Sequence, residues 1–181
     1  MKQFCLVFML LMSTMASRGF TVIGGEGLEG DRLATLVIDF SESEVEGLPL
    51  DDFLEDVNQT LEFKNEISEY YADFIKRFND RCKSIALTRV AGKPITLTVK
   101  VVMINRKGNE ALCHYVFSDT ATGSELLTES ERTREGRIGS FSNLVGDVIR
   151  EAGGDFGRFI TKYLKDKNKK SNYTNTDPIY E

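Results

Sequence analysis

The chain has 181 residues, with 23 Lys or Arg against 28 Asp or Glu, so its formal net charge is −5. This acidic balance argues against nucleic acid as a partner, because binding a phosphate backbone requires a basic face. Loss of a short N-terminal leader would leave about 160 residues, which suits one domain that can bury its own core.

The N-terminus has the features of a signal peptide. Lys2 precedes an apolar run at residues 4–12, and the small residues Ala16 and Ser17 suit cleavage by a signal peptidase. Leaders that are removed carry apolar runs of about 7–15 residues, whereas a membrane-spanning helix needs about 20. We therefore predict a signal peptide at residues 1–17, export to the periplasm or beyond, and no transmembrane span after cleavage. The alternative is an uncleaved N-terminal anchor.

The first half of the domain is predicted to hold one strand and two helices. Residues 33–40 are nearly all apolar, which favours a strand covered on both faces. A short helix follows near residues 51–57. In residues 65–82, apolar and aromatic side chains recur at helical spacing, which predicts an amphipathic helix packed on a sheet.

Alternation dominates the next part of the chain. Residues 95–105 and 111–119 alternate between apolar and polar side chains, and short turns join them to each other and to a strand at residues 125–133, which is typical of an antiparallel meander. The last strand is the most polar and is expected near an edge of the sheet. Residues 84–90 are predicted to add another strand before the meander.

A second long amphipathic helix is predicted at residues 144–164, capped by Ser142 or Asn143. It contains Gly146, Gly153 and Gly157, whose small size we expect to allow close approach to the sheet.

These elements predict a two-layer α/β (α+β) sandwich. A mostly antiparallel sheet of about five strands is expected to carry two long amphipathic helices on one face. The single α/β domain covers residues 18–165, and residues 166–181 are expected to form a disordered polar tail.

Two cysteines remain after the leader, Cys82 and Cys113. An oxidising compartment would allow a disulfide between them. We expect a pair of buried free thiols instead, since cysteine packs as a small apolar residue, and the disulfide stays open as the alternative.

Two motifs resemble functional sites without the context that such sites need. Residues 25–30 match the G-x-G-x-x-G pattern, but a dinucleotide site needs a helix after it, and a strand is predicted there. His114 is the only histidine, and its neighbour Cys113 should point to the opposite face of the same strand. We therefore expect no catalytic residue, no metal site built from His and Cys, and no cofactor.

A carboxylate site stays open as an alternative. Acidic residues in the 39–56 region could hold a cation such as Ca²⁺ through oxygen ligands or serve acid–base catalysis. The candidates are Asp39, Glu42, Glu44, Glu46, Asp51 and Asp52.

Several segments resemble those of uncharacterised exported proteins of Gram-negative bacteria. These are the residues 20–25, the strand ending in Asp39 before Phe40 and Ser41, the aromatic helix around Phe74 and Phe78, and the glycine-spaced last helix. The order of elements also resembles the periplasmic α/β domain of the curli-secretion lipoprotein family and the N-terminal domain of the TolB family. The chain lacks a lipoprotein cysteine and an amphipathic pore hairpin, so pore formation is not implied. The resemblance implies no catalytic residue.

The sequence therefore predicts an exported, non-catalytic periplasmic or cell-envelope domain that acts as a binding or interaction module. Its partner would be an unknown protein or envelope component, contacted through the polar strand at residues 125–133 or the acidic segment at residues 41–56. The alternative is a carboxylate-based enzyme or cation-binding protein.

Overall fold

The structure is a computed structural model that describes residue 28 and residues 32–174. The predicted leader at residues 1–17 lies outside these described residues, as does the glycine-rich segment except for the buried Leu28. None of the helices in the described part of the chain is both long and apolar enough to cross a membrane. The elements in chain order are β1 (Arg32–Asp39), β2 (Glu44–Val45), β3 (Leu48–Pro49), α1 (Leu50–Asp56), α2 (Thr60–Arg81), β4 (Ile85–Thr88), β5 (Ile95–Ile104), β6 (Glu110–Asp119), β7 (Glu125–Arg134) and α3 (Phe141–Thr174).

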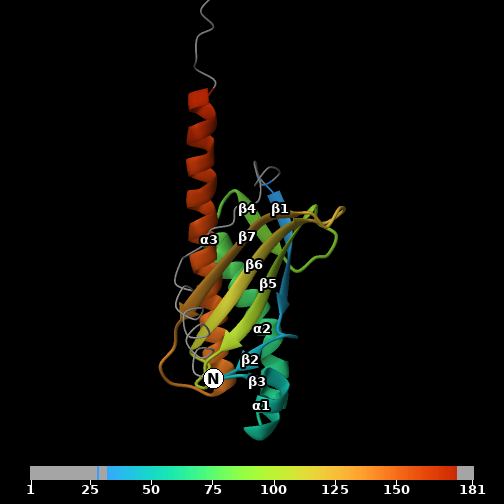
Figure 1. Cartoon of the computed structure of the whole chain (residues 1–181), viewed down its shortest axis with the longest axis vertical. Helices are drawn as coiled ribbons and strands as arrows, with labels where there is room; N and C mark the ends of the chain where they lie inside the picture. Colours follow the sequence, from blue (N-terminus) through green and yellow to red (C-terminus); the bar gives the residue numbers. More distant parts are fainter. Residues whose placement is uncertain (1–27, 29–31, 175–181) are drawn as a thin grey trace, which may run out of the picture.

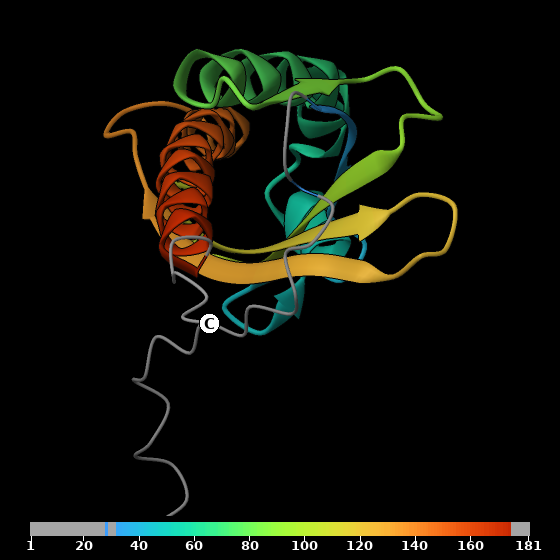
Figure 2. The same ribbon diagram turned by 90° about the horizontal axis from the view of Figure 1, so that it is seen from above.

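The two long helices lie side by side against one face of a curved sheet (Figures 1 and 2). The sheet curves around them, so that β4 lies beside α2 and β7 lies beneath α3. This arrangement confirms the predicted α+β class with two long helices on one face.

The strand directions differ from the prediction. The sheet has seven strands, and β1 pairs in parallel with both β4 and β5, as β2 does with β5. The predicted meander is confined to β5, β6 and β7, which pair antiparallel, with β7 at an edge as expected. The prediction of a mostly antiparallel sheet of about five strands is therefore wrong, although five strands are longer than two residues.

The segment between β4 and β5 explains this difference. It does not turn back as a hairpin but crosses β1, which lies between the two strands. The Thr35 hydroxyl donates to the Val90 carbonyl oxygen at 3.0 Å and accepts from the Lys93 N–H at 3.4 Å. The crossing covers Thr35 but leaves Leu33 50% exposed. The prediction that this strand is covered on both faces is therefore wrong.

Both long helices extend beyond their predicted bounds. The last helix begins at Phe141 because the Ser140 hydroxyl, not Ser142 or Asn143, accepts a backbone N–H of the first turn, that of Asn143 at 3.3 Å. It continues to Thr174, past the end of the sheet (Figure 1). Residues 166–174, predicted as disordered tail, are therefore helical, and residues 175–181 lie outside the described part.

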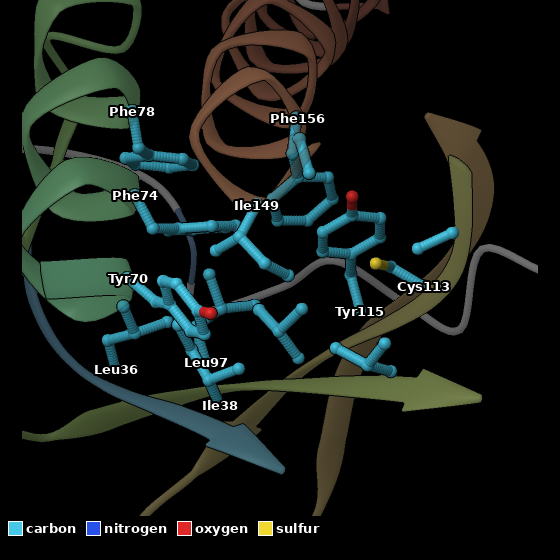
Figure 3. Packing of buried hydrophobic residues seen from close by; sticks show 14 of the residues in the cluster. Leu36, Ile38, Tyr70, Phe74, Phe78, Leu97, Cys113, Tyr115, Ile149 and Phe156 are labelled. Carbon is cyan, nitrogen blue, oxygen red and sulfur yellow. The ribbon is translucent and has the colours of Figure 1, made fainter. Parts of the chain in front are cut away.

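Aromatic rings from both layers fill the core (Figure 3). Phe156 of α3 is fully buried and stacks on Tyr115 of β6, with ring centroids 4.1 Å apart. Its ring also lies 6.0 Å from that of Phe78 on α2 and 5.8 Å from that of Phe117. Phe156 therefore joins α2, α3 and the sheet.

The glycines of α3 face α2, whereas the sequence predicted that they would face the sheet. A Cβ atom at Gly153 would lie 2.6 Å from the Phe74 carbonyl oxygen, and one at Gly157 would lie 2.9 Å from that of Phe78. The two helix backbones can approach this closely only because these side chains are absent. A Cβ atom at Gly154, the next residue, would have no neighbour nearer than 3.9 Å.

Candidate functional site

The acidic residues of the 39–56 region do not gather into a metal-binding cluster in the described part of the chain. Glu42, Glu44, Asp51 and Asp52 are exposed, and Asp39 is half-buried. Hydrogen bonds from Ser41 hold the pKa of Asp39 below its usual value. Within residues 32–174, no three His, Cys, Asp or Glu side chains are grouped so that they could hold a metal ion. The carboxylate alternative therefore gains no support from the geometry.

The cysteines take the second of their two predicted states. Cys82 follows the end of α2 and Cys113 lies in β6, and both are buried free thiols, as expected, so the possible disulfide between them is not formed in the structure. Burial raises the pKa of the Cys113 thiol to about 12, which keeps it protonated and unreactive at neutral pH. His114 lies half-buried on the opposite face of the strand from Cys113, as its alternation predicts.

A buried hydroxyl is poorly paired beneath α3. Tyr115 is fully buried, and its hydroxyl oxygen faces the Cys113 thiol and the Thr133 hydroxyl without forming a hydrogen bond of normal geometry to any described residue. Burial raises the pKa of Tyr115 well above its usual value. A buried unpaired hydroxyl destabilises a fold by about 1–3 kcal/mol.

Replacing Tyr115 with phenylalanine should therefore raise the free energy of unfolding, by about 1 kcal/mol or less, because a buried hydroxyl without a well-formed hydrogen bond is removed while the ring stays. Urea denaturation at pH 7 would measure the change. Tyr70→Phe is the matched control, since the Tyr70 hydroxyl donates to the Ser142 carbonyl oxygen at 2.8 Å and its removal should lower stability. A loss of stability in Tyr115→Phe would contradict the assignment.

Four cations gather at the end of the sheet where α3 begins, which is the lower end in Figure 1. Arg106 and Lys107 lie in the β5–β6 turn, Arg134 ends β7, and Arg137 lies in the loop before α3. We call these four residues the basic pole. All four are exposed. Arg106 lies 3.9 Å from Glu46, but Lys107, Arg134 and Arg137 form no ion pair with any residue in the described ranges.

A hydrogen-bonded asparagine holds the two segments of the basic pole together. Asn109 is buried, and its backbone N–H donates to Asn105 Oδ1 at 3.0 Å within the turn. Its side-chain Nδ2 donates to the Gly136 carbonyl oxygen at 3.3 Å, and its own carbonyl oxygen accepts from the Glu135 N–H at 3.1 Å. The turn and the loop therefore have a fixed relative position.

A glycine permits the same contact. Gly108 has a φ of +82°, which favours glycine, and a Cβ atom there would lie 2.6 Å from the Phe141 carbonyl oxygen. The turn can therefore pack directly on the start of α3.

Two clefts open at the basic pole and meet at Arg137. The first, the polar cleft, has a volume of about 430 Å³ and is lined by Asn109, Arg134, Glu135, Gly136 and Arg137. The second, the apolar cleft, has a similar volume of about 430 Å³. Its lining residues are Phe53, Val57, Gln59, Arg106, Lys107, Arg137, Ile138, Gly139, Phe141 and Leu144.

Sequence reasoning missed this site. Residues 105–109 and 136–140 read as a turn and a flexible link, and each carries only one or two basic residues. The available signal was the presence of Arg and Lys in two separate loops. Only the folded sheet shows that these loops are neighbours.

Comparison with known proteins identifies no family. No family model matches the chain, and no curated protein matches its sequence. Among solved structures, protein XCC0632 from Xanthomonas campestris aligns with a TM-score of 0.41 at 9% identity, covering 84% of this chain and 97% of that one.

Two further structures align more loosely. The PelC dodecamer from Paraburkholderia phytofirmans gives a TM-score of 0.37 at 9% identity, covering 75% of this chain and 92% of that one. Lipoprotein GNA1162 from Neisseria meningitidis gives 0.27 at 19% identity, covering 68% and 96%. All three proteins are bacterial, but similarity at this level defines neither a family nor a function for this chain.

Proposed function

We propose that this chain is an exported, non-catalytic binding module of the bacterial cell envelope and that it binds an anionic partner at the basic pole. Export rests on the signal-peptide features of residues 1–17. The binding role rests on one observation above all: in a protein with a net charge of −5, four cations line two adjoining clefts.

The arrangement suits recognition of an anion. Arg134 and Arg137 both line the polar cleft, and guanidinium groups bind phosphate or carboxylate oxygens through paired hydrogen bonds. Because three of the four cations have no ion pair among the described residues, binding need not first break one. The Asn109 hydrogen bonds fix the two segments in advance, which reduces the entropy lost on binding.

Titration of the exported chain with inorganic phosphate, followed by backbone amide NMR, tests this proposal. We expect the largest shifts at Asn109, Gly136 and Arg137. In the double variant Arg134→Gln/Arg137→Gln, affinity should fall about tenfold or more, since each charge-assisted hydrogen bond contributes about 1.5–3 kcal/mol.

The double variant Lys162→Gln/Lys165→Gln is the matched control. It removes two exposed charges from the far half of α3 and should leave phosphate binding at the basic pole unchanged. Shifts spread evenly over all lysines and arginines, or the same loss of affinity in both double variants, would refute a specific site.

A further inference from the structure

The two clefts differ in the chemistry of their walls, and this difference indicates a particular class of ligand. We propose that they bind the two halves of one amphiphilic anion, a single lipid-like molecule with a phosphate-type head group and an apolar chain. This inference rests on the proposed function, because it names the ligand of the same site. The shared Arg137 would lie where head group and chain meet.

The polar cleft suits the head group. Arg134 and Arg137 supply two guanidinium groups, and Glu135 is the only acidic residue in its lining. Arg106 and Lys107 bring two more cations to the neighbouring cleft, so the charged half of a ligand would have cations on both sides of it.

The apolar cleft suits the chain. The rings of Phe53 and Phe141 contribute to its lining, with centroids 4.8 Å apart, and Leu144 lies beside them. Val57 is 37% exposed and Ile138 is 95% exposed, which leaves apolar surface in water that a ligand chain would cover. A free inorganic anion would leave this surface unused.

The charges around the clefts favour a single molecule over a bilayer surface. Helix α1 supplies Phe53 to the apolar cleft, and its other side chains include four exposed carboxylates at the same end of the molecule. An anionic bilayer would face and repel them. A single amphiphile brings only one anionic head group near these carboxylates, whereas a bilayer brings many. The four carboxylates are Asp51, Asp52, Glu55 and Asp56.

Isothermal titration calorimetry of the exported chain with three probes tests the inference. The probes are dodecyl phosphate below its micelle concentration, inorganic phosphate, and dodecyl maltoside, which has the same chain and no charge. We expect dodecyl phosphate to bind at least about tenfold more tightly than either of the others, because only it uses both clefts.

Variants separate the two halves of the site. Arg137→Gln should weaken the binding of dodecyl phosphate and of inorganic phosphate about tenfold. Ile138→Ser should lower the affinity for dodecyl phosphate about threefold to tenfold and leave the affinity for inorganic phosphate unchanged. Leu61→Ser is the matched control, because Leu61 is 74% exposed on α2 and lines neither cleft, and it should change nothing.

The outcomes separate this inference from the proposed function. Equal affinity for dodecyl phosphate and inorganic phosphate, with no effect of Ile138→Ser, would refute the inference that the ligand is an amphiphile. The proposed function, binding of an anion at the basic pole, would still stand. Binding to vesicles of anionic phosphatidylglycerol without binding to monomeric dodecyl phosphate would also overturn it, in favour of a membrane surface. If no anionic probe binds at all, the proposed function is refuted as well.

Discussion

Replacing Phe156 with alanine should lower the free energy of unfolding by about 3–5 kcal/mol. The side chain is fully buried, and its ring contacts Tyr115, Phe117 and Phe78 from the two layers of the fold. Truncation removes these contacts and leaves a cavity that the stacked rings around it cannot easily fill. Chemical denaturation monitored by circular dichroism would measure the loss.

Leu61→Ala provides the control for this substitution. Leu61 is as apolar as a core residue but is 74% exposed, so the change should fall within about 0.5 kcal/mol. A loss below about 1 kcal/mol in Phe156→Ala would mean that this ring does not join the helices to the sheet as described.

The second large effect is expected at the contact between the long helices. Gly153→Ala should lower the free energy of unfolding by about 1–3 kcal/mol, because its new Cβ atom would lie 2.6 Å from the Phe74 carbonyl oxygen. The clash involves backbone on both helices, so no side-chain rotation relieves it. The melting temperature should fall accordingly, and differential scanning calorimetry would record it.

Gly154→Ala is the matched control, one residue away in the same helix. Its Cβ atom would meet nothing nearer than 3.9 Å, and alanine favours helix by about 1 kcal/mol over glycine. We expect this variant to be more stable than the parent chain. Similar effects of the two substitutions would contradict the close packing of α2 on α3.

Local pattern was enough to locate most elements. The helical spacing of aromatic residues in 65–82 indicated α2, and alternation indicated β5 and β6, because these periods follow from the geometry of one helix or one strand. Helix ends were less predictable. Nothing in the polar stretch after Lys165 distinguished helix from tail, and the helix continues to Thr174.

Relations between distant segments could not be predicted in the same way. Nothing local showed how the strand at residues 84–90 connects to β5, and the loop between them crosses β1 through the hydrogen bonds of Thr35, a residue more than fifty positions earlier. The glycines of α3 marked a close contact, but the sequence did not say whether the partner was the sheet or α2. Both outcomes depend on which surfaces meet after the chain has folded.

The sequence by itself determined the acidic composition, the apolar run at residues 4–12, the α+β class and most of the inward-facing residues of β5 and β6, because each depends on short-range periodicity or composition. Only the tertiary structure decided the parallel pairing of β1, the free state of Cys82 and Cys113, and the basic pole. Arg106 and Arg137 are 31 positions apart in the chain. They line one cleft because the antiparallel strands β6 and β7 carry the chain away and back, and the hydrogen bonds of Asn109 then join the turn to the loop.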